Sequence, residues 1–161
     1  MRTRIAMATF VMGLAMTAST RAAEEEIKLS EVPKVILDAV KVRFAGAELT
    51  GAARETDDDN KTVYEVSLKL KGQTIDSTWT PEGALQVIES KIDPKDVPEA
   101  VRKTIDGKYP KATWKIAEEV VAVENGKEKL DFYEVLLVTA DEKKLEVKVS
   151  PDGTIQAEEA K

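Results

Sequence analysis

The chain of 161 residues contains neither cysteine nor histidine. Without these two residue types, Ser-His-acid and Cys-His mechanisms cannot be assembled, and neither can the usual zinc and copper sites. The lack of cysteine also means that no disulfide stabilises the fold, which must depend on its buried core. The eight glycines are scattered singly, so no glycine-rich phosphate loop is present. We therefore expect a protein that is not an enzyme and has no cofactor and no metal site.

The start of the chain has the three-part layout of a secretory signal peptide. Arg2 and Arg4 precede an apolar run over residues 5–16, and small residues follow as far as Ala23. The run is shorter than the roughly 20 apolar residues that cross a bilayer, which favours cleavage over a permanent anchor. Cleavage after Ala18, Ala22 or Ala23 fits the small residues, and Ala22 is favoured. We expect residues 1–22 to be removed and the mature protein to be periplasmic or secreted.

Loss of this segment removes three arginines and makes the mature chain strongly acidic. It leaves 21 Lys and Arg against 30 Asp and Glu, a net charge of −9. A negative protein is repelled by nucleic acid and by anionic lipid headgroups, and no basic cluster interleaved with aromatic residues offsets this. We expect neither nucleic acid nor membrane as a partner, and a monomeric or weakly dimeric protein.

The same order of short motifs occurs twice along the chain. Val-Pro opens an amphipathic helical pattern, Tyr-Glu-Val opens an alternating strand, and Pro-X-Gly separates two further strands. The copies are Val32-Pro33, Tyr64-Glu65-Val66 and Pro81-Glu82-Gly83, then Val97-Pro98, Tyr133-Glu134-Val135 and Pro151-Asp152-Gly153. The period exceeds the roughly 20 to 50 residues of solenoid repeats. We therefore predict two repeats, over residues 23–92 and 93–161, which share one core because each alone would bury too little.

Hydrophobic periodicity locates the elements of each repeat. Apolar residues at three- and four-residue steps predict helices over residues 30–44 and 96–109, capped by Ser30 or Glu31 and by Asp96. Alternating patterns predict strands over residues 64–71, 73–80, 113–124, 132–139, 144–150 and 154–157, and a short strand from Leu85. Residues 48–54 make a poorer strand pattern. The acidic stretches at residues 24–26 and 158–159 are expected to be solvated ends.

These motifs resemble the PepSY-like domains that are grouped with beta-lactamase-inhibitor-like proteins. The resemblance also includes the aromatic residues Phe44 and Tyr109 that end the two helical patterns, and it covers residues 31–159. It implies an exported bacterial protein of the α+β class, in which two helix-plus-antiparallel-strand repeats share one sheet with the helices on one face. The inhibitor relatives bind an enzyme through the open face of that sheet. They hold their loops with disulfides, which this chain lacks.

Candidate contact residues lie on the strands of the two Tyr-Glu-Val motifs and on the strand after the first. In the first copy Glu65, Ser67 and Lys69 are all polar. The corresponding residues of the second copy are Glu134, Leu136 and Val138, of which the last two are apolar, and Phe132 comes one step earlier. An exposed apolar patch commonly marks a partner site; a central strand covered on both sides would bury these residues instead. Trp79 shares a side of its strand with Ile75, which favours the core over contact with a partner. The partner-binding candidates are Phe132, Glu134, Leu136, Glu65 and Trp79.

The expected function is a non-catalytic binding module that acts on another extracytoplasmic protein or peptide, as an inhibitor or a modulator. The alternative is an envelope sensor of a small ligand or Ca²⁺, for which Asp57-Asp58-Asp59-Asn60 offers oxygen ligands. Contiguous acidic side chains point in different directions, which favours a solvated turn there. A structural envelope protein without a discrete ligand is a third hypothesis.

Overall fold

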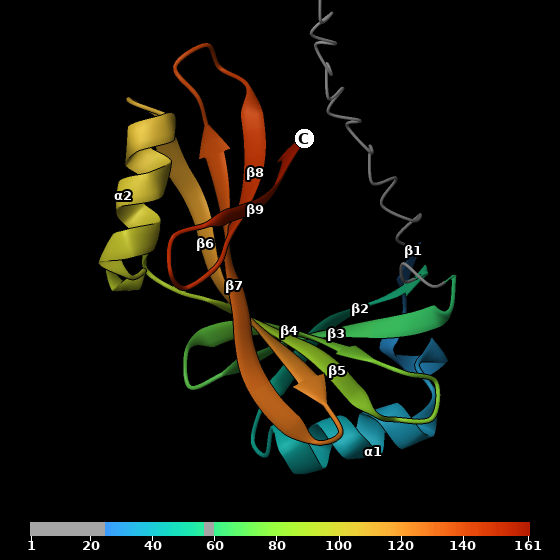
Figure 1. Ribbon diagram of the computed structural model, residues 1–161. Helices are drawn as coiled ribbons and strands as arrows, with labels where there is room; N and C mark the ends of the chain where they lie inside the picture. Colours follow the sequence, from blue (N-terminus) through green and yellow to red (C-terminus); the bar gives the residue numbers. More distant parts are fainter. Residues whose placement is uncertain (1–24, 57–59) are drawn as a thin grey trace, which may run out of the picture.

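The computed structural model describes residues 25–56 and 60–161 of the chain, so the predicted signal peptide and Asp57 to Asp59 lie outside it. Within these described residues, nine strands form one antiparallel sheet in which every strand pairs with the next along the chain (Figure 1). The strands are β1 (Glu25–Ile27), β2 (Glu48–Thr56), β3 (Thr62–Leu70), β4 (Gln73–Trp79), β5 (Leu85–Lys91), β6 (Thr113–Glu124), β7 (Lys127–Val138), β8 (Lys144–Val149) and β9 (Ile155–Ala160). The α-helices are α1 (Lys34–Arg43) and α2 (Glu99–Lys108).

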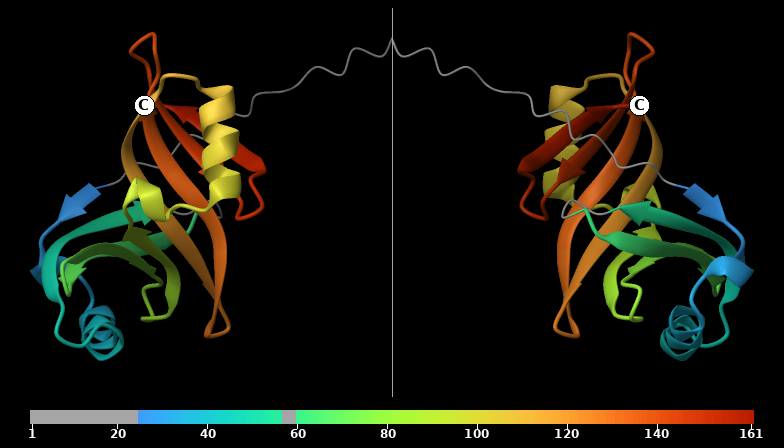
Figure 2. Two further views of the ribbon diagram at one scale, coloured as in Figure 1. Left: turned by 90° about the vertical axis from the view of Figure 1, so that its left-hand side faces the viewer. Right: turned by 90° about the vertical axis from the view of Figure 1, so that its right-hand side faces the viewer.

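The predicted α+β class, with two helix-plus-strand repeats and their helices on one face, is wrong. Residues 25–56 and 60–161 form one nine-stranded sheet, and the two α-helices among them have only ten residues each. Strand twist accumulates along a sheet, so β2–β5 and β6–β9 run in different directions and α1 and α2 lie at opposite ends of the molecule (Figure 1, Figure 2). The helices therefore form no common layer.

Two hydrophobic clusters replace the single core that we expected. The first joins α1 to β2–β5 and has at its centre Ile36, Val40, Phe44, Val66, Leu68, Ile75 and Trp79. The second joins α2 to β6–β8 and contains Val101, Ile105, Tyr133, Val135, Leu137, Val147 and Val149. A ten-residue helix is only about 15 Å long, so each helix covers the strands next to it and no others.

The hairpin of β6 and β7 connects the two clusters. Ala117 belongs to the second cluster, whereas Val121 and Val123 further along β6 pack against the first. Near the tip of the hairpin, Glu128 forms an ion pair with Arg43 at the end of α1, with 2.8 Å between Glu128 Oε1 and Arg43 Nη2. The backbone ladder between β5 and β6 also crosses the predicted boundary between the two repeats. The two parts of the molecule are thus joined by backbone as well as by side chains.

Both helices begin later than the sequence pattern predicts. Pro33 and Pro98 stand at the N-caps with extended ψ angles of 135° and 146°, and no side chain caps either helix. Short 3₁₀ turns, Leu29–Glu31 and Pro94–Asp96, take up the preceding residues. Val32 and Val97 are buried between turn and helix. Burial of these valines, and not a polar cap, therefore positions each helix start.

Three segments expected outside the sheet are parts of strands. The acidic lead forms β1, which pairs with residues 52–54 of β2 and packs Ile27 against the first cluster. Asn125 and Gly126, both with positive φ, close a tight turn, so β7 begins five residues before the predicted strand. Near the end of the chain, β9 includes Glu158, which is 2.7 Å from Lys108 of α2. Pairing and burial of neighbours override local polarity in all three.

Candidate functional site

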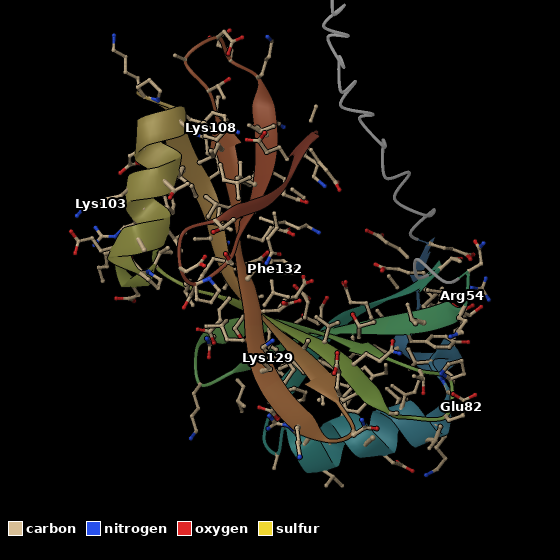
Figure 3. The ribbon with its side chains drawn as sticks, in the orientation of Figure 1. Arg54, Glu82, Lys103, Lys108, Lys129 and Phe132 are labelled. Carbon is tan, nitrogen blue, oxygen red and sulfur yellow. The ribbon has the colours of Figure 1, made fainter. Side chains whose placement is uncertain are left out.

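A surface made by β4–β8 is covered by neither helix. Successive side chains of a strand point to opposite sides of the sheet. The residues that alternate with the cluster residues along each strand therefore point away from α1 and α2. We call this surface the open face and define it by Asp76, Glu89, Glu118, Val120, Phe132, Glu134, Leu136, Glu146 and Lys148. In Figure 1, α2 lies to the left of β6–β9 and α1 lies below β2–β5. Phe132 lies beside β7 near the middle of the molecule, where the two parts of the sheet meet (Figure 3).

Strand register brings acidic residues together on this face. Asp76 stands directly opposite Glu89 across β4 and β5, and Glu118 stands directly opposite Glu134 across β6 and β7. Like charges directly opposite each other in a sheet destabilise the pairing. Since no single strand carries more than two of these residues, the acidic row is a product of the strand order and not of a local sequence cluster.

The apolar part of the open face adjoins the acidic row. Phe132 stands opposite Val120, which is buried, and the phenyl ring itself is only partly covered. Leu136 is also partly exposed and stands opposite Glu146. The ammonium of Lys148 lies 5.2 Å from the centroid of the Phe132 ring. Phe132 belongs to neither hydrophobic cluster, so its ring remains accessible from the open face.

The acidic residues have raised pKa values. Burial, and then the negative charges of Glu134, Glu118 and Asp76, raise the pKa of Glu89 to about 7. Burial, and then Glu134 and Asp76, raise the pKa of Glu118 to about 7. For Glu134 the pKa is also raised, first by burial and next by the charge on Glu146. Glu89 and Glu118 therefore titrate close to neutral pH.

Lysine side chains of the described residues form ion pairs with only two of the acidic residues that define the open face, Glu134 and Glu146. Lys148 lies 3.4 Å from Glu134, a long ion pair that burial and Glu146 outweigh in setting the Glu134 pKa. Lys161 at the end of the chain lies 2.8 Å from Glu146. Within residues 25–56 and 60–161, the carboxylates of Glu89 and Glu118 make no ion pair and no hydrogen bond. Two partly buried carboxylates of the described residues thus face the open surface without an ion pair, although Lys91 of β5 stands opposite Glu118.

The structure brings three of the five predicted contact residues together. Phe132, Glu134 and Leu136 lie at alternate positions of β7 on the open face. Glu65 points to the same side of the sheet, but it belongs to β3, with three strands between it and β7. It lines a small concavity of about 260 Å³ next to β1 and β2.

Trp79 is not a contact residue. Its side chain is 2% exposed in the first cluster, and its Nε1 donates a hydrogen bond of 2.9 Å to Ser77 Oγ. The hypothesis that it touches a partner is therefore wrong, and its shared side with Ile75 was the correct signal. Sequence reasoning missed the acidic residues of neighbouring strands, Asp76, Glu89, Glu118 and Glu146. Their alternation with apolar residues marks them as outward-facing, but strand pairing alone shows that they are neighbours.

Metal-binding clusters and membrane-spanning helices are lacking in the part of the chain that the structure describes. No group of three or more acidic side chains there is arranged to hold a metal ion. Asp57 to Asp59 lie outside that part, so the calcium alternative stays a prediction from the sequence. Among the described helices, neither is long and apolar enough to cross a membrane.

Comparison with known proteins identifies the fold and no closer relationship. No protein-family model matches the chain, and no curated protein matches it. A solved DUF2874 family protein from Bacteroides uniformis aligns with a TM-score of 0.63 and 16% identity, over 80% of this chain and 88% of that one. A BLIP-like protein from Bacteroides fragilis aligns with a TM-score of 0.57 and 15% identity, over 78% and 84%. A Bacteroides eggerthii protein, provisionally described as periplasmic, gives 0.63 and 13%, over 80% and 88%.

These structural similarities support the fold that the predicted resemblance implies, and not membership of a particular family. The fold is related to that of BLIP-like proteins, as the beta-lactamase-inhibitor-like resemblance implied. Membership of a PepSY-like tandem-repeat family stays a prediction, as does the division at residues 92 and 93. The description of the Bacteroides eggerthii protein agrees with the expected periplasmic location.

Proposed function

We propose that this chain is an exported, non-catalytic binding module of the periplasm, which docks another protein or peptide on its open face and inhibits or modulates it. The observation that carries this proposal is the partly exposed pair Phe132 and Leu136 on a sheet face that neither helix covers. Aromatic side chains at the centre of an interface commonly supply much of the binding free energy. The acidic row around them would supply orientation and specificity.

Two considerations favour binding over catalysis. Raised carboxyl pKa values also occur in glycosidase sites, where an acid and a base flank the substrate. Here Glu89, Glu118 and Glu134 lie on strands of one face and so approach a ligand from the same side. The sequence offers no histidine or cysteine to add a nucleophile or a second base. The BLIP-like description of a protein that shares this fold is consistent with a binding role.

Affinity capture from the envelope fraction tests the proposal, with the tag at the C-terminus of the mature chain. We expect a protein that wild type captures to be lost with Phe132→Ala, because the aromatic anchor is removed. The melting temperature of this variant should stay within a few degrees of wild type, since Phe132 lies outside both clusters. Val42→Ala is the matched control, because Val42 is apolar and 83% exposed on α1. Equal capture by wild type and Phe132→Ala would contradict docking on this face.

A further inference from the structure

Glu89 and Glu118 lie in a field of mostly negative charge. They occupy neighbouring strands, and each stands directly opposite another acidic residue, Asp76 and Glu134 respectively. Further charged groups on this side of the sheet include Glu65 and Lys69 of β3, Lys91 of β5, Lys129 of β7, Lys144, Glu146 and Lys148 of β8, Glu159 of β9 and Lys161. Of these cations, Lys148 and Lys161 form ion pairs with Glu134, Glu146 and Glu159. Lys91 stands directly opposite Glu118 and lowers the Glu118 pKa, but burial and the neighbouring negative charges outweigh it. The repulsion around Glu89 and Glu118 is therefore not relieved by an ion pair within the described residues.

The chain itself shows which group this surface accommodates. The Lys148 ammonium lies 3.4 Å from a carboxylate oxygen of Glu134 and 5.2 Å from the Phe132 ring centroid. An ammonium or guanidinium group is stabilised by both neighbours at once, through charge and through the face of the ring. Lys148 makes an ion pair with Glu134 only, and Lys91 opposite Glu118 forms no ion pair, so the described residues offer Glu89 and Glu118 no equivalent contact. A second cation from outside would complete the arrangement.

We propose that the open face binds a basic segment of a partner protein, with one Lys or Arg side chain of that segment seated against Glu89 and Glu118 and an apolar side chain beside it on Phe132. This inference rests on the proposed docking function and names the chemistry of the partner. Charge complementarity carries it, because a cation converts an unfavourable carboxylate row into a set of ion pairs. Partial burial makes each such pair stronger than one at an exposed surface.

Binding of such a segment should depend on pH. Burial raises the pKa of Glu89 and of Glu118 to about 7, so both are largely ionised at pH 8.0 and largely neutral at pH 5.5. A bound lysine or arginine stays charged over this whole range. Binding of a basic segment should therefore weaken on acidification, whereas binding by apolar contact alone should not.

The probe is a displayed library of random 12-residue peptides, selected on the mature protein, residues 23–161, at pH 8.0. We expect the selected peptides to carry Lys or Arg next to an apolar residue. Titration calorimetry with a synthesised selected peptide should show the dissociation constant rise about tenfold or more in Glu89→Gln/Glu118→Gln, because charge-assisted contacts are lost. Replacing the Lys or Arg of the peptide with Gln, or lowering the pH to 5.5, should weaken binding to a similar extent.

The control variant is Glu82→Gln/Glu142→Gln, which removes two charges at exposed turns away from the open face. It should change the dissociation constant less than twofold, and an equal loss in both double variants would overturn the proposal in favour of unspecific attraction. Melting at pH 8.0 checks folding: Glu89→Gln/Glu118→Gln should be at least as stable as wild type, because repulsion is relieved.

Other outcomes separate this inference from the docking function. Selected peptides should lose binding in Phe132→Ala if the docking function is correct. If such peptides need neither Lys nor Arg, or bind Glu89→Gln/Glu118→Gln as well as wild type, the proposed basic segment is overturned and the docking function stands. If no peptide depends on Phe132, both proposals fail. A saturable heat with Ca²⁺ alone that disappears in Glu89→Gln/Glu118→Gln would replace the basic segment with an inorganic cation.

Discussion

Single residues set the internal fit of each cluster. Ser77 is a fully buried polar side chain of β4, and its hydroxyl donates a hydrogen bond of 3.0 Å to the Val66 carbonyl while accepting one from Trp79 Nε1. The hydroxyl thus satisfies two polar groups inside an apolar cluster. We expect Ser77→Ala to cost about 1 to 3 kcal/mol, because a buried indole N–H is left unpaired. Chemical denaturation measures this, and Ser67→Ala, partly exposed on β3, should stay within about 0.5 kcal/mol.

The glycine of the second Pro-X-Gly turn is required by contact as well as by conformation. Gly153 has φ of +90°, and a Cβ there would lie 2.9 Å from the Ala100 carbonyl oxygen of α2. The same turn is held by a 2.8 Å hydrogen bond from Thr104 Oγ1 to the Gly153 carbonyl oxygen. A Pro-X-Gly segment is typical of a tight turn in which glycine adopts a positive φ, but only the packed structure shows the helix against the turn.

Gly126 offers a matched comparison, since it has φ of +73° and a Cβ there would meet no atom of the described residues within 4 Å. We expect Gly126→Ala to cost about 1 kcal/mol, from the positive φ alone. Gly153→Ala should cost about 2 to 4 kcal/mol, because a steric clash adds to the same conformational strain. Equal losses in denaturant unfolding would contradict close packing of this turn on α2.

At the scale of the strands, register gives the open face its acidic row and ties stability to pH. The pKa values of Glu89 and Glu118 are raised from 4.5 to about 7 in the folded chain. Between these values the folded state binds more protons than the unfolded state, so stability falls as the pH rises. Acidic groups with a lowered pKa, such as Asp141 at about 2, change the free energy of unfolding only at more acidic pH.

We therefore expect the free energy of unfolding to be higher at pH 5.5 than at pH 8.0, by about 1 kcal/mol after allowance for partial exposure. For a domain of this size the melting temperature should rise by about 2 to 5 °C on acidification. Thermal melts of wild type and of Glu89→Gln/Glu118→Gln measure the effect, which the double variant should largely lose. Greater stability of wild type at pH 8.0 would show that these carboxylates have cation partners after all.

For the whole molecule, the question is whether two clusters behave as one cooperative unit. The β6–β7 hairpin packs Val121 against the first cluster and Val135 in the second, and the sheet is continuous between them. We expect a single thermal transition whose calorimetric and van't Hoff enthalpies agree. Val121→Ala should lower the free energy of unfolding by about 1 to 2 kcal/mol without dividing the thermal transition into two. The Arg43–Glu128 ion pair is about half exposed, so Arg43→Ala should cost less than about 0.5 kcal/mol.

Hydrophobic periodicity in the sequence determined where the helices and most strands lie, because burial of one side of an element is written in the spacing of its apolar residues. It also placed Phe132, Glu134 and Leu136 on one side of their strand, since alternation along one strand is a local property, but it left open whether that side is covered. The tertiary structure alone decided that nine strands form one continuous twisted sheet with two separate clusters. It alone placed Glu89 and Glu118 on neighbouring strands, where neither forms an ion pair within the described residues. Both depend on pairing between distant segments, which no local pattern of residues encodes.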